Sequence, residues 1–278
     1  MRPVPGTLAA ELRDALGLRR AVETGTFRGD GARTLAAIFD EVVTIELSEK
    51  LYSEASVNLG DEPAVRVLNG NSAKLLGDLV EIEKPTFFWL DGHWSGGETV
   101  GMDEQCPVLG EVAAISAGHP DDCVLIDDAR FFSASPPPPY DRSQWPTLTE
   151  LMDTIRDAWP DHHVTVVKDV VVAVPGRAKP LVDDFGHRED ERTEQGADAR
   201  VGREAKARER DVRTRLRRVE RQLTKTQGKL AKTQSKLAKA QGRLKRTRRR
   251  LGRIEGSRWW RTGQALARAG SVQRSGRR

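Results

Sequence analysis

Two apolar runs in the middle of the chain lie almost next to each other, and no other feature constrains the fold as strongly. Residues 163–167 and 170–174 are separated only by Lys168 and Asp169. Two strands joined by two residues must form an antiparallel hairpin, because a parallel connection needs a dozen or more residues. We therefore expect one antiparallel pair in the sheet that this chain forms.

Upstream of the hairpin, short apolar runs alternate with segments of helical periodicity. This alternation predicts a parallel sheet with helices on both faces. The expected strands are 20–23, 42–46, 64–68, 86–91 and 123–127. The expected helices are 8–18, 31–39, 50–59, 73–82, 107–117 and 148–158. Together with the hairpin these strands make a seven-stranded α/β domain, which we place at residues 1–178.

The first expected strand runs directly into a glycine-rich turn, Glu23-Thr-Gly-Thr-Phe-Arg-Gly29. Glycines at such a turn let the backbone approach a cofactor closely, and the carboxylate can accept a hydrogen bond from it. We expect Glu23, Thr24, Gly25, Phe27 and Gly29 to bind this cofactor. Because glycine-rich turns are frequent, the alternative is a turn with no ligand.

Polar residues follow the second and third expected strands. Glu46 ends the second strand about twenty residues after the turn, where a carboxylate can accept both hydroxyls of a ribose. Asn71 and Ser72 follow the third strand, from where a polar side chain can reach an adenine edge. We expect all three to bind the cofactor. The alternatives are an exposed strand-end carboxylate and an ordinary helix N-cap.

Carboxylates also follow the fourth and fifth strands, at Asp91 and at the pair Asp127 and Asp128. The carboxyl ends of parallel strands meet at one crevice, where three carboxylates would repel one another without a cation. Mg²⁺ prefers such ligands and would lower the pKa of an acceptor hydroxyl, whose proton His93 could take as general base. Asp91 is expected to contact the cofactor as well. In the alternative, the Asp pair caps a loop and His93 lies at the surface.

Four motifs resemble bacterial class I methyltransferases that use S-adenosylmethionine (SAM) and are often found near cell-surface glycan genes. The resemblance covers about residues 15–175, and its most specific part is the loop after the fourth strand. The motifs are Glu23-Thr-Gly-Thr-Phe, Ile45-Glu-Leu-Ser, Phe88-Trp-Leu-Asp-Gly-His-Trp-Ser-Gly-Gly97 and Leu125-Ile-Asp-Asp-Ala-Arg130.

The same residues are similar to the sugar O-methyltransferases of macrolide and aminocoumarin antibiotics, the macrocin O-methyltransferase-like, magnesium-dependent group. This resemblance implies a class I methyltransferase sheet ending in an antiparallel hairpin, SAM as cofactor, and Mg²⁺ held by Asp91, Asp127 and Asp128. The chain departs from the group at two positions. His93 stands where the group has an Asp base, and Asn71 stands where related sequences usually have Asp.

Leucine recurs every seven residues from Leu216 to Leu251, and the motif Lys225-Thr-Gln-Gly-Lys-Leu-Ala repeats with small changes. A period of seven over this length predicts an α-helical coiled coil, which we place at residues 211–255. With leucine at position a, position d is apolar only at the two ends, Val219 and Ile254. We therefore expect a weak coil that allows self-association, and the repeat does not fix the number of chains.

Charge divides the chain, because residues 1–199 carry a formal charge of −18 and residues 200–278 carry +23. This indicates a basic segment that meets an anionic surface or polymer, or else the acidic domain of its own chain. We expect a charged linker or solvated helix at 179–210 and a basic tail at 256–278. In the tail, Trp259 and Trp260 among arginines suit an anionic membrane interface, and a disordered tail is the alternative.

The cysteines and the apolar runs favour the cytoplasm. Cys106 and Cys123 are the only cysteines, and they are not spaced as a metal knuckle or a redox pair. The N-terminus shows no secretion signal, and no run approaches the ~20 apolar residues of a membrane span. We expect a cytoplasmic protein with peripheral contact at the inner face of the cell membrane.

The motifs and the resemblance together predict an O-methyltransferase that transfers the SAM methyl group to a sugar hydroxyl. The acceptor would be a glycan, a glycolipid or a glycosylated metabolite, as in polysaccharide biosynthesis. A nucleic-acid methyltransferase that grips RNA or DNA through the basic coil is less favoured, because aromatic residues do not interleave with the basic repeat. A third alternative is a non-enzymatic coiled-coil scaffold.

Overall fold

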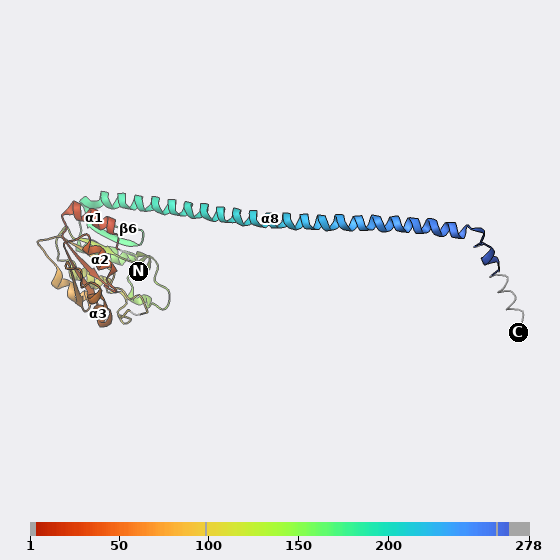
Figure 1. Ribbon diagram of the computed structural model, residues 1–278. Coiled ribbons are helices and arrows are strands. Elements are labelled where there is room, and N and C mark those ends of the chain that lie inside the picture. The colour runs from red at the N-terminus through yellow and green to blue at the C-terminus, as the bar shows by residue number, and fades with distance from the viewer. Residues whose placement is uncertain (1–3, 98, 260, 267–278) are drawn as a thin grey trace, which may run out of the picture. The chain divides into compact units, whose positions relative to one another are not determined.

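The computed structural model describes residues 4–97, 99–259 and 261–266. The chain divides into two compact units, Met1–Gly196 and Ala197–Arg278. The first unit contains a sheet and the helices that pack on it, and the described part of the second unit is almost entirely helical (Figure 1).

One seven-stranded sheet with the order β3-β2-β1-β4-β5-β7-β6 forms the centre of the first unit. Strands β1 to β5 are parallel, and β7 runs antiparallel to both β5 and β6. This order and ending are those of the class I methyltransferase sheet, so the predicted fold is confirmed. The strands are β1 Arg20–Thr24, β2 Glu41–Glu46, β3 Val65–Asn69, β4 Thr86–Leu90, β5 Cys123–Ile126, β6 His162–Val167 and β7 Val170–Pro175.

The hairpin of β6 and β7 forms where the two apolar runs predict it. Val164 lies opposite Ala173, and Val167 lies opposite Val170. Lys168, in the two-residue turn, has a φ of 57°. This left-handed backbone is what the tightest hairpin turns require. The turn also brings Asp169 to the sheet edge beside β5.

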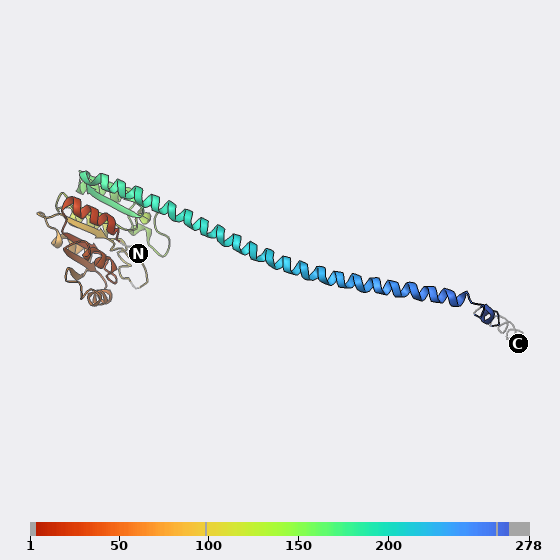
Figure 2. The ribbon, with the colours of Figure 1, turned by 45° about the horizontal axis from the view of Figure 1, so that its top comes forward.

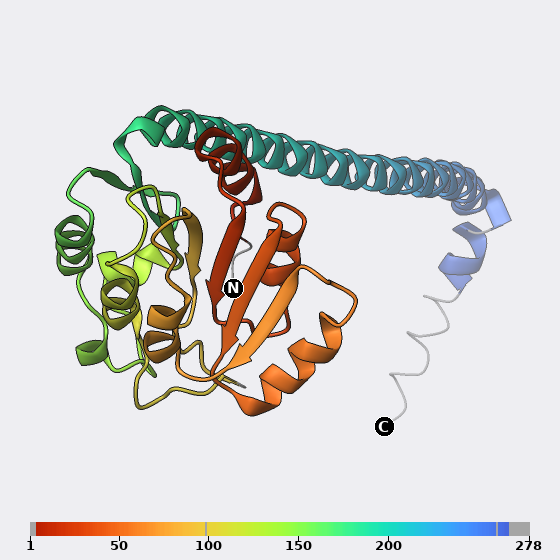
Figure 3. The ribbon, with the colours of Figure 1, turned by 90° about the vertical axis from the view of Figure 1, so that its left-hand side faces the viewer.

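Helices cover both faces of the sheet, as Figure 3 shows. Side chains alternate along β4, so that Phe87 and Trp89 belong to one apolar core and Phe88 and Leu90 to the other. The helices are α1 Gly6–Leu16, α2 Asp30–Ala36, α3 Glu49–Asn58, α4 Ser72–Leu75, α5 Val108–Ile115, α6 Ala129–Ser133, α7 Leu148–Ala158 and α8 Lys179–Glu255, with 3₁₀ helices η1 Leu76–Leu79, η2 Arg142–Gln144 and η3 Gly176–Ala178. The first core takes side chains from α1, α2 and α8, and the second from η1, α5, α6 and α7.

The first compact unit runs to Gly196, beyond the expected domain boundary at residue 178. Helix α8 begins at Lys179, and its residues Val182 and Phe185 are buried in the first core. Arg188 forms an ion pair with Glu11 at 2.7 Å, so the first turns of α8 lie along α1 (Figure 2). Residues 179–210 are thus helical, and the first part of the expected linker belongs to the α/β unit.

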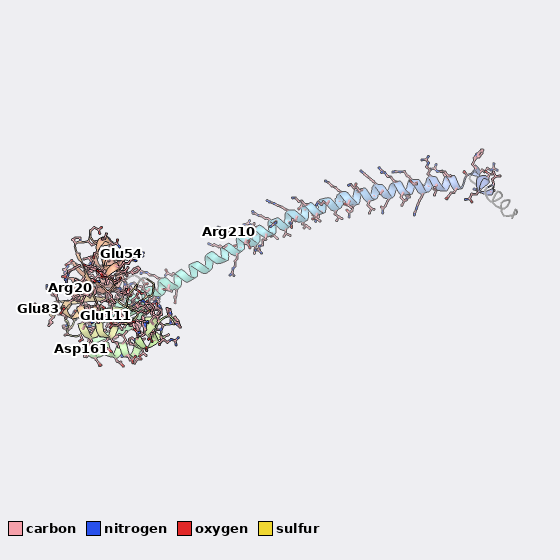
Figure 4. The ribbon with its side chains drawn as sticks, turned by 90° about the horizontal axis from the view of Figure 1, so that it is seen from below. Arg20, Glu54, Glu83, Glu111, Asp161 and Arg210 are labelled. Carbon is pink, nitrogen blue, oxygen red and sulfur yellow. The ribbon has the colours of Figure 1, made fainter. Side chains whose placement is uncertain are left out.

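In the second unit, the side chains described on α8 are exposed to solvent, among them that of Arg210 (Figure 4). Trp259, beyond the end of α8, is 89% exposed. The predicted basic tail lies in part outside the described residues, since Trp260 and residues 267–278 are not among them. None of the helices in the described part of the chain is long and apolar enough to cross a lipid bilayer.

Candidate active site

A cleft opens at the carboxyl ends of β1, β2 and β4, where an open parallel sheet places its ligands. The space between its walls, which includes open solvent, measures about 600 Å³. It is lined by Gly25, Phe27, Ile45, Glu46, Leu47, Gly70, Asn71, Ser72, Asp91, Gly92, His93, Ser95, Thr99, Val100, Glu104 and Pro107. Most of the residues predicted to bind a cofactor therefore face one cavity.

Gly25 forms the floor of this cleft, and no other residue fits its position. Its φ is +80°, a backbone that favours glycine. A Cβ atom there would lie 2.2 Å from the carbonyl oxygen of Asp91, on the neighbouring strand end. The turn after β1 is therefore pressed against the loop after β4. This leaves bare backbone facing the cavity, which a cofactor can approach closely.

Glu46 ends β2 and presents its carboxylate at the cleft wall. Its Oε2 atom accepts a hydrogen bond from the Phe27 amide and its Oε1 atom one from the Ser48 amide, each at 2.8 Å. Burial raises its pKa, and these two backbone hydrogen bonds oppose the rise. The carboxylate is thus held in one orientation, and with the Leu47 amide also acting on it, it retains acceptor capacity for a ribose hydroxyl.

Glu23 lies behind the cleft wall rather than in it. Thr44 Oγ1 donates to Glu23 Oε2 at 2.6 Å, and a Cβ atom at Gly31 would lie 2.1 Å from Oε1. The carboxyl group is therefore enclosed between β1, β2 and the start of α2. Burial raises the pKa of Glu23 to about 8, despite the Thr44 hydrogen bond. At neutral pH the Glu23 carboxyl group is mostly protonated and neutral, and it supports the glycine-rich turn after β1 from the side away from the cleft.

Asn71 and Ser72 follow β3 and also line the cleft. Asn71 Nδ2 donates to Glu104 Oε2 at 3.0 Å, while its Oδ1 atom is buried and accepts no hydrogen bond from any described residue. Asn71 precedes α4 without capping it through its side chain. Ser72 and Thr24 hydrogen-bond to the buried Glu111 of α5 and hold its pKa down against a larger rise from burial. The free carbonyl oxygen of Asn71 is placed to accept a donor from a ligand.

His93 stands between two carboxylates at the far end of the cleft. Its Nε2 atom lies 2.8 Å from Asp128 Oδ2, and its Nδ1 atom lies 3.4 Å from Asp91 Oδ1. Burial raises the pKa of Asp91 well above its ordinary value, and the charges of Asp127 and Asp128 add to the rise. For Asp128 burial acts the same way, but His93 and Arg130 outweigh it, so the pKa of Asp128 is lowered. His93 therefore lies between Asp128, a carboxyl group with a lowered pKa, at Nε2 and Asp91, a carboxyl group with a raised pKa, near Nδ1.

Arg130 and Asp169 brace the loop that carries the Asp pair. Asp128 has a φ of 59°, an uncommon backbone for a residue other than glycine. Arg130 contacts Asp128 Oδ1 at 2.6 Å and also forms an ion pair with Asp169. The Arg130 amide donates to Asp169 Oδ1 at 2.8 Å. The hairpin turn thus fixes the orientation of Asp128, which in turn contacts His93.

The three carboxylates predicted to hold magnesium differ in how the protein engages them. Among the described residues, no group of three His, Cys, Asp or Glu side chains is arranged so that it could hold a metal ion. Asp128 contacts His93 through Oδ2 and Arg130 through Oδ1, whereas both carboxylate oxygens of Asp127 are buried without a hydrogen-bond partner among the described residues. Asp127 is buried, and burial together with the charge of Asp128 raises its pKa. Asp91, Asp127 and Asp128 therefore lie near one another, and magnesium at these residues stays a prediction.

Aromatic side chains form a wall beside His93. Its ring centroid lies 5.5 Å from that of Trp145, and Phe131 lies 5.3 Å from Trp145. Tyr140 contacts both Phe131 and Trp94, each at 5.4 Å. This aromatic wall comes from the loop after β4, from α6 and from the segment between α6 and α7, so it forms only in the folded protein.

The buried Gln105 joins two of these loops. Its Oε1 atom accepts hydrogen bonds from the Asp141 amide at 2.9 Å and from Trp145 Nε1 at 3.4 Å. Its carbonyl accepts one from the Trp94 amide at 2.7 Å. The aromatic wall is therefore held against the loop that carries His93.

The structure brings together most of the residues predicted from the sequence. Six of the nine predicted cofactor residues line the cleft together with His93, whereas Glu23, Thr24 and Gly29 lie behind it. Sequence reasoning missed Glu111, Gln105, Arg130 and Asp169. Of these four residues, only Asp169 had a signal in the sequence, because it lies in the two-residue turn of the predicted hairpin.

No protein-family model matches the chain, and no curated protein sequence matches it. Solved structures similar to it include the O-methyltransferase from Bacillus cereus in complex with SAH, at 19% identity and a TM-score of 0.46, covering 63% of this chain and 82% of that one. Another is the O-methyltransferase TomG from Streptomyces achromogenes in complex with SAM, at 17% identity and a TM-score of 0.45, covering 61% and 79%. The SAH-bound methyltransferase PaMTH1 from Podospora anserina is similar at 16% identity and a TM-score of 0.42, covering 61% and 76%. At such identities, the similarity extends to the fold alone.

Proposed function

We propose that this chain is a SAM-dependent O-methyltransferase that acts on a sugar hydroxyl. One observation carries the proposal: a single cleft at the carboxyl ends of β1, β2 and β4 contains two features. Glu46 and Asn71 offer acceptors that suit a nucleoside, and His93 is paired with the Asp128 carboxylate. A binding site for a nucleoside and a base for proton transfer are the two elements that methyl transfer from SAM to a hydroxyl requires.

The residues of the cleft fit SAM. Gly25 offers bare backbone, Glu46 offers acceptors for ribose hydroxyls, and Asn71 Oδ1 is a buried acceptor without a donor. When bound, SAM supplies a methyl group on a positively charged sulfur, which is already activated for transfer. The negative charge of Asp128, whose pKa is lowered, favours that positive charge.

His93 takes the proton of the acceptor hydroxyl. When Nε2–H donates to Asp128, Nδ1 carries no proton and can accept one, so the hydrogen bond to Asp128 sets the tautomer. The proton of the acceptor hydroxyl would pass to Nδ1 of His93. Asp128 then stabilises the charged imidazolium, as the carboxylate does in a histidine–aspartate pair.

The aromatic wall supports a sugar as the acceptor. Tyr140 and Trp94 combine an apolar ring with a polar group, which suits a molecule that presents both C–H faces and hydroxyls. The wall also lies within contact of His93, through Trp145. A glycan or glycolipid precursor is the acceptor class that this surface and the resemblance of the motifs favour.

No magnesium step belongs to the proposed mechanism. Asp128 binds His93 and Arg130, so it acts on the base directly rather than through an ion. The proposal also includes peripheral membrane contact, because Trp259 is exposed and lies between Arg258 and Arg261. Such a pairing of tryptophan with arginine suits an anionic lipid interface.

Transfer of a labelled methyl group tests the proposal. The purified chain is incubated with methyl-labelled SAM and nucleotide sugars, lipid-linked oligosaccharides or RNA. We expect label in the sugar acceptors, lowered about 10²–10⁴-fold by His93→Ala because the general base is lost. The exposed His187→Ala is the matched control and should retain full activity. Label in RNA alone, or equal transfer by His93→Ala, would contradict the proposal.

A further inference from the structure

The helix of the second unit carries an apolar seam that has no partner among the described residues. Its six leucines are each 54–58% exposed, and Val219 and Ile254 extend the seam at 59% and 46%. A regular apolar row of this length on a soluble helix indicates that another surface covers it. The leucines are Leu216, Leu223, Leu230, Leu237, Leu244 and Leu251.

Threonines in the middle of the seam do not prevent its burial. Thr226 Oγ1 donates to the Gln222 carbonyl at 2.9 Å, and Thr233 Oγ1 donates to the Lys229 carbonyl at 3.0 Å. Because each hydroxyl is satisfied within its own helix, removing it from water leaves no donor unpaired. The seam can therefore close along its whole length, although threonine contributes less apolar surface than leucine.

Charge is distributed unequally on the two sides of the seam. The basic flank consists of the residue before each leucine: Arg215, Gln222, Lys229, Lys236, Arg243 and Arg250. The neutral flank consists of the residue four positions after each leucine: Glu220, Gln227, Gln234, Gln241, Arg248 and Glu255. In a coiled coil these are positions g and e, which set the orientation of the partner helix.

The two orientations of a partner copy differ sharply in charge. In a parallel, in-register pair, the basic flank of one helix faces the neutral flank of the other, so that Arg250 meets Glu255 and Lys229 meets Gln234. Only Arg243 then meets a like charge, at Arg248. In a fully overlapping antiparallel pair each flank faces its own copy. The basic flanks then repel each other along the seam, and the glutamates of the neutral flanks also face each other.

We infer that the leucine seam joins this chain to a further copy of itself, with the helices parallel and in register. The inference goes beyond the proposed function, since methyl transfer does not depend on it. The parallel arrangement places the same end of each helix together. It also leaves a further row of basic residues away from the seam, so that these like charges are not brought together. The row consists of Arg218, Lys225, Lys232, Lys239, Arg246 and Arg253.

The mass of the full-length protein in solution tests the association. We expect sedimentation to give at least twice the mass of one chain for the wild type. Leu230→Lys with Leu237→Lys should give a single chain. Ala231→Lys with Ala238→Lys adds the same charge to the back of the same helix and should associate as the wild type does. A wild type that sediments as one chain would overturn the inference, and binding of that single chain to heparin would identify an anionic polymer as the partner instead.

Disulfide trapping tests the orientation independently of whether the lysine variants keep their helix. Val219→Cys lies in the seam and should form a disulfide with its own copy in a glutathione buffer. Gly228→Cys lies on the outer side of the helix and should not form this disulfide. The wild type shows whether Cys106 and Cys123 form disulfides by themselves. A Val219→Cys chain that links only to a Leu251→Cys chain would show an antiparallel pair and overturn the inference.

Discussion

Replacing Glu23 by Gln is expected to remove a large part of the pH dependence of stability. Burial between β1, β2 and α2 raises the pKa of Glu23 from its ordinary 4.5 to about 8. As the pH rises between these values, the unfolded chain releases the proton while the folded chain keeps it. The free energy of unfolding therefore falls with rising pH, at about 1.4 kcal/mol per unit, or about 5 kcal/mol over the whole interval.

Between pH 5 and pH 7 this single group lowers the free energy of unfolding by about 2–3 kcal/mol. Asp91 and Asp127 add to the fall in the wild type and in the variant alike, since their pKa values are also raised. Glu23→Gln is neutral at every pH and should flatten the curve by that amount.

The assay is urea unfolding at pH 5, 6, 7 and 8, followed by the fluorescence of the buried Trp89, Trp145 and Trp159. At a slope of about 2 kcal/mol per molar urea, the difference corresponds to about 1 M in the midpoint. The exposed Glu83→Gln is the control and should follow the wild type. If Glu23→Gln shows the same pH dependence as the wild type, Glu23 is not held as a neutral acid and the reasoning is refuted.

Three further predictions follow from the site and the tail. Gly25→Ala should weaken SAM binding at least tenfold, because its Cβ would strike the Asp91 carbonyl. The control is Gly17→Ala, which has a similar positive φ but open space around it. Calorimetry should show that Gly17→Ala leaves the SAM affinity unchanged. EDTA should leave the rate of methyl transfer unchanged, since Asp128 is already paired within the protein, and a rate restored only by added Mg²⁺ would speak against the mechanism. Trp259→Ser should lower sedimentation with anionic vesicles without affecting neutral ones, and equal sedimentation of variant and wild type would remove the membrane contact.

The fold could be predicted because its decisive features are local. The two apolar runs around Lys168 and Asp169 leave only one way for β6 and β7 to pair, and the register follows from it. Glu46 and Asp91 could be identified because they stand at strand ends, and all parallel strand ends of this sheet meet at one edge. The placement of these residues needs no long-range information beyond the alternation of strands and helices.

The support behind the site could not be predicted in the same way. Glu111 occupies a core position of α5 and is buried through contacts with Ser72 and Thr24, which are distant in sequence. Arg130 reaches Asp169 across 39 positions of the chain. Neither pairing leaves a periodic pattern, because each depends on how the loops pack in three dimensions.

Two predicted site residues have partners that the sequence does not indicate. Glu23 has the right position in the motif, but Thr44 and the start of α2 enclose it, so that it supports the cleft instead of lining it. Asp128 follows β5 as expected, but Arg130, two residues later, turns back to neutralise it. The sequence shows the charges, whereas the partner of each charge depends on the loop conformation.

The most direct test of the account is calorimetric titration of SAM into the full-length protein, comparing the wild type with Glu46→Gln and Glu49→Gln. Glu46 holds its carboxylate at the cleft, whereas Glu49, three residues away, is exposed to solvent. Losing a hydrogen bond from a ribose hydroxyl to a charged acceptor costs about 1.5–3 kcal/mol, so Glu46→Gln should bind SAM about 10–100-fold more weakly. Glu49→Gln should bind as the wild type does. A wild type that does not bind SAM, or two variants with equal affinity, would contradict the assignment of the cleft as the SAM site.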